Sequence, residues 1–150
     1  MKKKTVIFDL DGTLALIDKR RAISTKDDGK MDWDKFFDPQ NIDLDLPNKP
    51  VIDMAKILSS HGFKIWILSG RSDVTQKATL NWLSDNDVWF DHLQMRPKKH
   101  HFMKDSDLKQ MWLDDIGVDN VAMVFDDRNQ VVDMWRKNGL QTFQVAKGDF

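Results

Sequence analysis

The chain has 150 residues, a formal net charge of −1 and 41% hydrophobic residues, which suits one compact domain. It contains no Cys, no Tyr and no Glu, so all 24 acidic residues are Asp. These absences exclude disulfides, zinc–thiolate sites, cysteine nucleophiles and any site that needs a glutamate. Carboxylate chemistry in this chain must therefore use aspartate.

Nothing in the sequence resembles a signal peptide or a membrane helix. The basic start at residues 1–4 is followed by a short apolar run that Asp9 interrupts at once. No run approaches the roughly 20 apolar residues that a membrane helix needs. We expect a cytoplasmic protein without membrane attachment. The net charge gives no overall attraction to nucleic acid, although local basic patches can provide it.

Strands and helices are predicted to alternate along most of the chain. The β-rich run at 5–10 predicts a buried strand that ends in a loop at Asp11 and Gly12. Helical apolar spacing over 51–60, with Pro50 near its start and a Gly after its end, predicts a helix. The later expected elements, in chain order, are a strand 63–68, a helix 73–84, a weaker strand 92–95, a helix 105–116, a strand 120–125, a helix 129–137 and a strand 140–145.

Residues 14–49 differ from the rest of the chain. This stretch is rich in Asp and Lys and contains an aromatic cluster of Trp33, Phe36 and Phe37. We expect a loop-rich insertion near the active site, with one short helix. Five of the six Trp are expected to pack in the core, which leaves Trp33 as the candidate for stacking on a base. The five are Trp66, Trp82, Trp89, Trp112 and Trp135.

This order of elements predicts one α/β domain over residues 1–150: an open, mostly parallel, Rossmann-like sheet with helices on both faces. Ligands of such sheets bind at the carboxyl ends of the strands. Polar clusters follow three of the expected strands, at 9–13, 69–71 and 126–128. We therefore expect the functional site at that edge of the sheet.

Two of these clusters each contain a pair of carboxylates, Asp9 with Asp11 and Asp126 with Asp127. Two carboxylates about 4 Å apart repel by about 4 kcal/mol at an effective dielectric constant near 20, which favours binding of a divalent cation. Oxygen ligands of this kind suit Mg²⁺. A single Asp pair is ordinarily a turn or a helix cap, but two pairs at the ends of two strands favour a metal site.

Four short motifs follow one another along the chain, at 8–14, 68–71, Lys109 and 125–128. In this order they resemble the signature of the haloacid dehalogenase (HAD) phosphatase superfamily. Residues 125–136 and the tail 144–150 resemble the phosphatase domain of phage-type polynucleotide kinase–phosphatases, which removes 3′-phosphates from nucleic acid ends. The resemblance implies a HAD fold, and both gaps between the motifs are too short for a cap domain, so only a small insertion replaces it.

The resemblance also implies the catalytic roles. Asp9 would attack phosphorus and form an aspartyl-phosphate, and Asp11 would protonate the leaving oxygen and then activate water. Lys109 would balance the negative charge of the carboxylates and the phosphate. Mg²⁺ would bind the Asp9 carboxylate, the Asp11 backbone carbonyl, Asp126 and Asp127.

Further positions match the substrate-binding residues of this group of enzymes. Arg71 follows the Ser-Gly loop, so its guanidinium can reach a phosphate. Asp105 lies four residues before Lys109 and either orients that amine or caps the helix. The full set of expected phosphate or substrate contacts is Thr13, Arg20, Ser69, Gly70, Arg71 and Asp105.

We therefore expect a Mg²⁺-dependent hydrolase that removes terminal 3′-phosphates from polynucleotides, with nucleic acid ends as its partner and no protein partner. Two alternatives stay open: a HAD nucleotidase or small-molecule phosphomonoesterase, and a non-catalytic module that binds nucleic acid ends. A kinase domain is not expected, because the residues around Gly29 and Lys30 do not match a P-loop. Basic residues lie around the predicted site and favour a nucleic acid: Lys19, Arg20, Arg21, Arg96, Lys98, Lys99, His100, His101 and Lys104.

Overall fold

A computed structural model describes residues 4–150, so the first part of the basic start, residues 1–3, lies outside the described chain. Five parallel strands form the main sheet in the order β5-β4-β1-β6-β7. The strands are β1 (Thr5–Phe8), β4 (Lys64–Ser72), β5 (His92–Arg96), β6 (Val121–Asp126) and β7 (Thr142–Gln144). This arrangement confirms the predicted open, parallel sheet.

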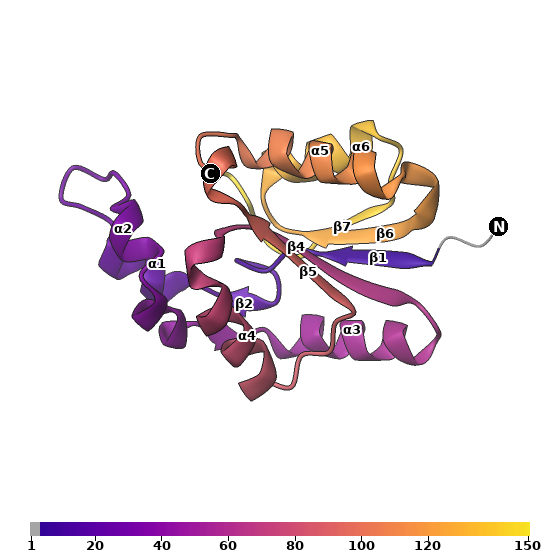
Figure 1. Cartoon of the computed structure of the whole chain (residues 1–150), viewed down its shortest axis with the longest axis horizontal. Helices are drawn as coiled ribbons and strands as arrows, with labels where there is room; N and C mark the ends of the chain where they lie inside the picture. Colours follow the sequence, from indigo (N-terminus) through magenta and orange to yellow (C-terminus); the bar gives the residue numbers. More distant parts are fainter. Residues whose placement is uncertain (1–3) are drawn as a thin grey trace.

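Two pairs of helices cover the two faces of this sheet (Figure 1). One pair is α3 (Lys49–Ser60) and α4 (Gln76–Asp85), and the other is α5 (Asp105–Ile116) and α6 (Asn129–Lys137). The bounds of α5 and α6 are those predicted from the sequence. The N-terminal part of the predicted helix 73–84 is a separate 3-10 helix, η2 (Asp73–Thr75). The other single-turn helices are η3 (Lys98–His100) and η4 (Val118–Asn120).

The core forms because successive side chains of a strand point to opposite faces of the sheet. In β1, Val6 and Phe8 pack with the apolar side chains of α3 and α4, whereas Ile7 packs with those of α5 and α6. All three side chains are buried. The central strand is therefore fixed from both faces, and so is the position of the polar residues that follow it.

The insertion is more ordered than the sequence predicts, and the expectation of a loop-rich segment with one short helix is wrong. Strands β2 (Ala15–Leu16) and β3 (Leu46–Pro47) pair antiparallel at its base. Between them lie α1 (Asp18–Ser24), α2 (Trp33–Phe36) and the 3-10 helix η1 (Pro39–Leu44). Elements of four to seven residues are too short to give a clear helical period. In Figure 1 they project beyond the carboxyl ends of the strands.

Two further expectations need correction. Strand β4 continues to Ser72 instead of ending at Leu68, with a shift in its pairing to β5 between Ser69 and Ser72. Trp89 is 56% exposed and does not pack in the core as predicted, because it lies in the loop after α4. Among residues 4–150, no helix is both long and apolar enough to cross a membrane.

Candidate active site

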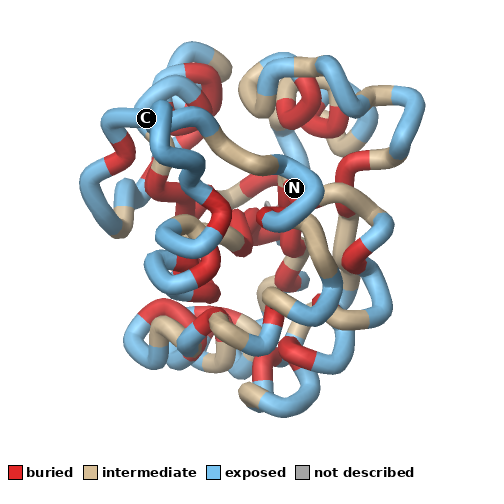
Figure 2. The backbone as a smooth tube through the Cα atoms, turned by 90° about the vertical axis from the view of Figure 1, so that its left-hand side faces the viewer, coloured by how far each residue is buried: buried red, intermediate tan, exposed pale blue. Residues whose placement is uncertain are grey.

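The carboxyl ends of β1 and β6, which are neighbours in the sheet, bring three aspartates together. Asp9 follows β1, Asp126 ends β6 and Asp127 comes next in the chain. One carboxylate oxygen from each of them lies within 4.8 Å of the other two, and all three residues are buried. Figure 2 looks onto this end of the molecule and shows buried backbone at its centre.

The turn after β1 is shaped by Gly12 and Thr13. Gly12 has a φ of +84°, and a Cβ atom there would lie 2.1 Å from Oδ2 of Asp127, so only glycine fits. The Thr13 hydroxyl lies 3.3 Å from Oδ2 of Asp9 and 3.3 Å from Oδ1 of Asp127, and can donate to either. This turn thus connects the two carboxylate pairs that the sequence predicts.

Lys109, on α5, provides the positive charge nearest to the cluster. Its Nζ donates to Oδ1 of Asp9 at 2.7 Å and to Oδ2 of Asp126 at 3.2 Å. The indole Nε1 of Trp135 donates to the same Asp126 oxygen at 3.1 Å, a contact that the sequence does not reveal. One ammonium group therefore contacts a cluster of three carboxylates.

The electrostatics of the cluster favour an added cation. Burial, reinforced by the Asp126 carboxylate, raises the pKa of Asp9 well above its usual range, while Lys109 opposes the shift. Burial and Asp126 raise the pKa of Asp127 in the same way. Burial alone would lower the pKa of Lys109, but Asp126 and Asp9 raise it, so the amine stays protonated. Three oxygen ligands with an uncompensated negative charge fit a hard divalent cation such as Mg²⁺.

Asp11 faces a different environment, made by two buried arginines. Nη2 of Arg20 donates to Oδ1 of Asp11 at 2.6 Å, and Nη2 of Arg71 donates to the same oxygen. Burial alone would raise the pKa of Asp11, but the guanidinium groups of Arg71 and Arg20 lower it to about 2. The Asp11 side chain is 20% exposed, so a bound substrate can reach it.

Asp45, which the sequence analysis did not single out, holds these two arginines together. Its side chain is fully buried; Arg20 donates to it through Nε and Nη2, both at 3.0 Å, and Arg71 through Nη2 at 3.1 Å. Nε1 of Trp82 donates to the Asp45 backbone carbonyl at 3.0 Å. Asp45 thereby links the insertion to α4 and to the end of β4.

Asp105 does not contact Lys109 by a hydrogen bond, and it is not the helix cap either, because α5 begins at Asp105 and its N-cap is Lys104. Its carboxylate instead accepts hydrogen bonds from Arg96 and from Nη1 of Arg128, the latter at 2.8 Å. A Cβ on Gly70 would lie 2.2 Å from Oδ1 of Asp105. Asp105 therefore packs directly against the end of β4 that carries Ser69 and Gly70, both predicted phosphate contacts.

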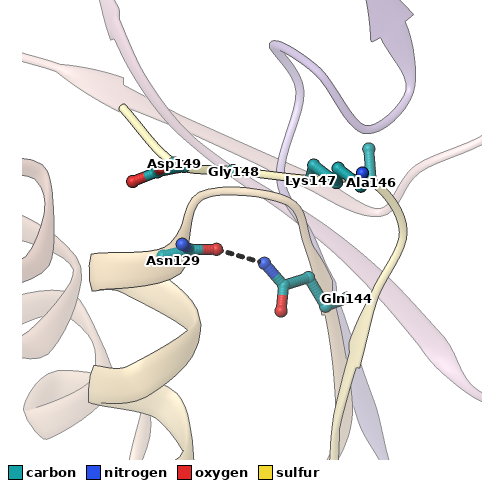
Figure 3. A pocket seen from close by; sticks show the side chains of 6 residues that line it. All are labelled: Asn129, Gln144, Ala146, Lys147, Gly148 and Asp149. Atoms are coloured by element: carbon teal, nitrogen blue, oxygen red, sulfur yellow. Dashed lines mark hydrogen bonds between the residues drawn. The ribbon is translucent and has the colours of Figure 1, made fainter.

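The C-terminal tail packs against the loop that carries the Asp126 and Asp127 pair. The backbone N–H of Asn129 donates to the carbonyl of Gly148 at 2.9 Å, and Nε2 of Gln144 donates to the carbonyl of Asp127 at 3.0 Å. Beside the tail lies an open hollow of about 570 Å³, in which Gln144 also bonds Asn129 at 2.6 Å (Figure 3). None of the predicted catalytic residues lines this hollow.

Gly148→Ala is expected to destabilise the protein by about 1–3 kcal/mol, the usual cost of overpacking, and to lower turnover. The reason is that a Cβ at position 148 would lie 1.8 Å from the carbonyl oxygen of Asp127, so the loop or the tail must move. Urea unfolding and the hydrolysis rate measure the two effects. Lys147→Ala, at an exposed position of the same tail, is the matched control. Unchanged stability in Gly148→Ala would contradict this packing.

A parallel sheet with an Asp-x-Asp turn after its central strand, a lysine from a covering helix and an Asp pair after the neighbouring strand defines the chain as a HAD phosphatase. Residues 3–150 match the polynucleotide kinase PNKP phosphatase domain, and the chain belongs to this family. The resemblance found in the motifs is therefore confirmed over residues 3–150.

Similar proteins agree with this assignment. A protein of Autographa californica nuclear polyhedrosis virus, named as a bifunctional polynucleotide kinase/RNA ligase, is 34% identical over 150 residues, covering 96% of this chain and 20% of that protein. A chain of the solved Pnkp1/Rnl/Hen1 complex is 36% identical with a TM-score of 0.77, covering 99% of this chain and 47% of that one. The present chain thus spans less than half of either relative.

A HAD family enzyme of Bacteroides thetaiotaomicron, solved with magnesium and inorganic phosphate, has a TM-score of 0.62 at 16% identity. The match covers 99% of this chain and 97% of that one. At this identity the likeness concerns the fold alone. It shows that nearly the entire chain shares the fold of that enzyme.

Proposed function

We propose that this protein is a Mg²⁺-dependent phosphatase that removes terminal 3′-phosphates from polynucleotides through an aspartyl-phosphate intermediate. The observation that carries the proposal is the buried Asp9 carboxylate, bonded to Lys109 and flanked by Asp126 and Asp127 at the end of the central strand. Membership of the PNKP phosphatase family supports the choice of a nucleic acid end as substrate.

In the first step an oxygen of Asp9 attacks phosphorus, and the bond from phosphorus to the ester oxygen breaks. Lys109 stays protonated and keeps the carboxylates of Asp9 and Asp126 in position, because its Nζ donates to both. Water then attacks the phosphorus of the aspartyl-phosphate, which releases inorganic phosphate and restores the Asp9 carboxylate. Thr13, Ser69 and Gly70 offer hydroxyl and backbone donors to the phosphoryl oxygens.

Asp11 is the residue that we assign to proton transfer. With a pKa of about 2 it is ionised in the free protein at neutral pH. A dianionic phosphate beside it would raise that pKa, because like charges disfavour ionisation. Asp11 therefore takes up a proton from solvent as the substrate binds, passes it to the leaving oxygen and, ionised again, takes a proton from the attacking water. Arg20 and Arg71 fix its orientation for both steps.

Asp9, Asp126 and Asp127 are the side chains that would hold Mg²⁺, since their oxygens lie within 4.8 Å of one another and carry more negative charge than Lys109 balances. When bound, Mg²⁺ supplies positive charge that stabilises the phosphoryl group during transfer. The three carboxylates keep their positions through contacts with Thr13, Lys109 and Trp135.

The shape of the chain around the site suits the end of a polymer. The insertion between β1 and α3 contributes only short helices and a two-stranded sheet, and no separate cap domain occurs within residues 4–150. A large cap would enclose a small substrate and exclude a strand. The decisive experiment compares hydrolysis of 3′-phosphorylated oligonucleotides, 5′-phosphorylated oligonucleotides and mononucleotides, each with and without Mg²⁺.

The proposal expects fast release of phosphate from the 3′-phosphorylated oligonucleotide in the presence of Mg²⁺ only. Hydrolysis of mononucleotides alone would show a nucleotidase instead. Binding of oligonucleotide ends without any hydrolysis would show a non-catalytic end-binding module.

Mg²⁺ is expected to raise the melting temperature of the protein, because a cation that binds only the folded state stabilises it. The shift should be largely lost in Asp126→Asn, which removes one ligand from the cluster. Asp107→Asn, on the exposed face of α5, should keep the full shift. Differential scanning fluorimetry with a Mg²⁺ titration measures this. An equal shift in Asp126→Asn would place the metal elsewhere.

A further inference from the structure

Two segments that are connected to residues of the site differ sharply in charge. The acidic rim, residues 26–44, contains α2 and has six carboxylates and three lysines: Asp27, Asp28, Asp32, Asp34, Asp38, Asp43, Lys26, Lys30 and Lys35. The basic loop, residues 98–104, links β5 to α5 and has no acidic residue: it carries Lys98, Lys99, His100, His101 and Lys104. All three lysines of the basic loop are exposed.

Arg96 fixes the basic loop against the site. This largely buried side chain donates through Nη1 to the carbonyls of His100 at 2.8 Å and Met103 at 2.7 Å. Its Nε donates to the carbonyl of Gly70 at 2.8 Å, and its Nη2 donates to Asp105. One guanidinium therefore joins the basic loop to the end of β4, which carries the predicted phosphate contacts Ser69 and Gly70. A surface fixed in advance loses less conformational entropy when a ligand binds.

The tip of the basic loop presents an aromatic side chain to water. Phe102 is 96% exposed, more than any other large hydrophobic residue of the described chain. The ring of His101 meets it edge to face, with centroids 4.3 Å apart. An exposed ring among lysines is the combination by which proteins bind single-stranded nucleic acid, through base stacking and phosphate contacts.

We propose that the basic loop docks the single-stranded segment that leads to the phosphorylated end, with Phe102 stacked on a base and Lys98, Lys99 and Lys104 beside phosphates. This inference rests on the proposed function, and it identifies the segment beside the site that the strand crosses. Trp33, the sequence-based candidate for stacking, is 59% exposed but lies in the acidic rim, where carboxylates repel a phosphate backbone. Arg20 and Arg96, also expected near the strand, are buried in internal ion pairs.

The test measures binding of a fluorescein-labelled single-stranded oligonucleotide that ends in a 3′-hydroxyl, by fluorescence anisotropy. Phe102→Ala should raise the Kd roughly fivefold or more, and Phe102→Trp should restore binding because stacking returns. A variant with Lys98, Lys99 and Lys104 all changed to Ala should bind more weakly. The slope of its log Kd against log salt should also be smaller, by about 0.7 for each phosphate that a lysine no longer neutralises. Trp33→Ala is the matched control and should bind like the wild type.

Hydrolysis of a nucleoside 3′-monophosphate, which has no single-stranded segment to dock, should be the same in all these proteins. Two results would overturn the docking proposal. One is an unchanged Kd for the oligonucleotide in Phe102→Ala; the other is a blunt duplex that binds as tightly as the single strand, with the same Kd in the wild type and in Phe102→Ala. If the wild type hydrolyses 3′-phosphorylated oligonucleotides while Phe102→Ala changes nothing, docking fails and the proposed function stands. If binding depends on Phe102 but no end is hydrolysed, docking stands and the proposed function fails.

Discussion

Asp9→Asn is expected to lower phosphate release from a 3′-phosphorylated oligonucleotide by roughly 10⁴-fold or more, the size of loss seen when a nucleophile is removed. An amide cannot form the acyl-phosphate on which the proposed reaction depends. The protein should remain folded, because Asn keeps the size of the side chain and its oxygen can still accept the hydrogen bond from Lys109. Steady-state phosphate release and circular dichroism measure the two properties.

The same substitution should make the metal-free protein more stable at high pH. The pKa of Asp9 in the folded state lies above its ordinary value of 3.8, mainly through burial and then through Asp126. Ionising this carboxylate therefore costs folding free energy. Below pH 3.8 the group is protonated in both states and the cost is absent; the cost develops as pH rises through the folded-state pKa. Asn cannot ionise and avoids this cost. The difference in unfolding free energy between Asp9→Asn and the wild type should therefore grow with pH in the presence of EDTA.

Asp107→Asn is the control for both measurements, since Asp107 is an exposed aspartate of α5. It should match the wild type in rate and in the pH dependence of unfolding. Substantial turnover by Asp9→Asn would exclude Asp9 as the nucleophile. A stability difference between Asp9→Asn and wild type that does not change with pH would mean that the Asp9 carboxylate is not the source of the penalty.

The main sheet and the covering helices follow from local sequence signals. Helices α5 and α6 are amphipathic and are followed closely by Gly117 and Gly139, so their bounds can be predicted to the residue. The strand ends are less certain. The continuation of β4 to Ser72 depends on its pairing with β5, which lies in a separate part of the chain beyond α4. The elements of the insertion are too short to show the helical spacing of apolar residues, so they cannot be identified from sequence.

In the site, too, local sequence signals predict some contacts, whereas contacts between distant parts of the chain cannot be predicted. Asp9, Asp126 and Asp127 could be predicted to meet because each lies at the carboxyl end of a strand of one parallel sheet, and the structure brings them together with Lys109. The bonding of Asp105 to Arg96 and Arg128 could not be predicted, since it joins three separate parts of the chain. Asp45 gives no local signal at all: it is one of several aspartates in an acidic segment, and only the folded chain buries it.

Asp45→Ala is expected to destabilise the protein by about 3–5 kcal/mol, because it leaves buried charges without their partner. Arg20 and Arg71 would then have only Asp11 as a carboxylate partner, and Arg20 would lose both of its bonds to Asp45. Asp45→Asn keeps an oxygen that can accept from one arginine, so a smaller loss of stability is expected. Urea unfolding of both variants gives the comparison, with Asp43→Ala, an exposed change in η1 two residues before Asp45, as the control.

Because Asp45→Asn should still fold, it separates the role of Asp45 in stability from its role in the reaction. Without the second carboxylate, both guanidinium groups are free to shift around Asp11, and displacements of about 1 Å at a reacting group can cost roughly 10²-fold in rate. We therefore expect kcat to fall by a factor of this order in folded Asp45→Asn, with little change in KM. A folded variant with the kcat of the wild type would show that Asp11 is oriented by Arg20 and Arg71 without help from Asp45. The buried carboxylate would then serve only to hold the insertion against the end of β4, through the bonds that Arg20 and Arg71 make to it.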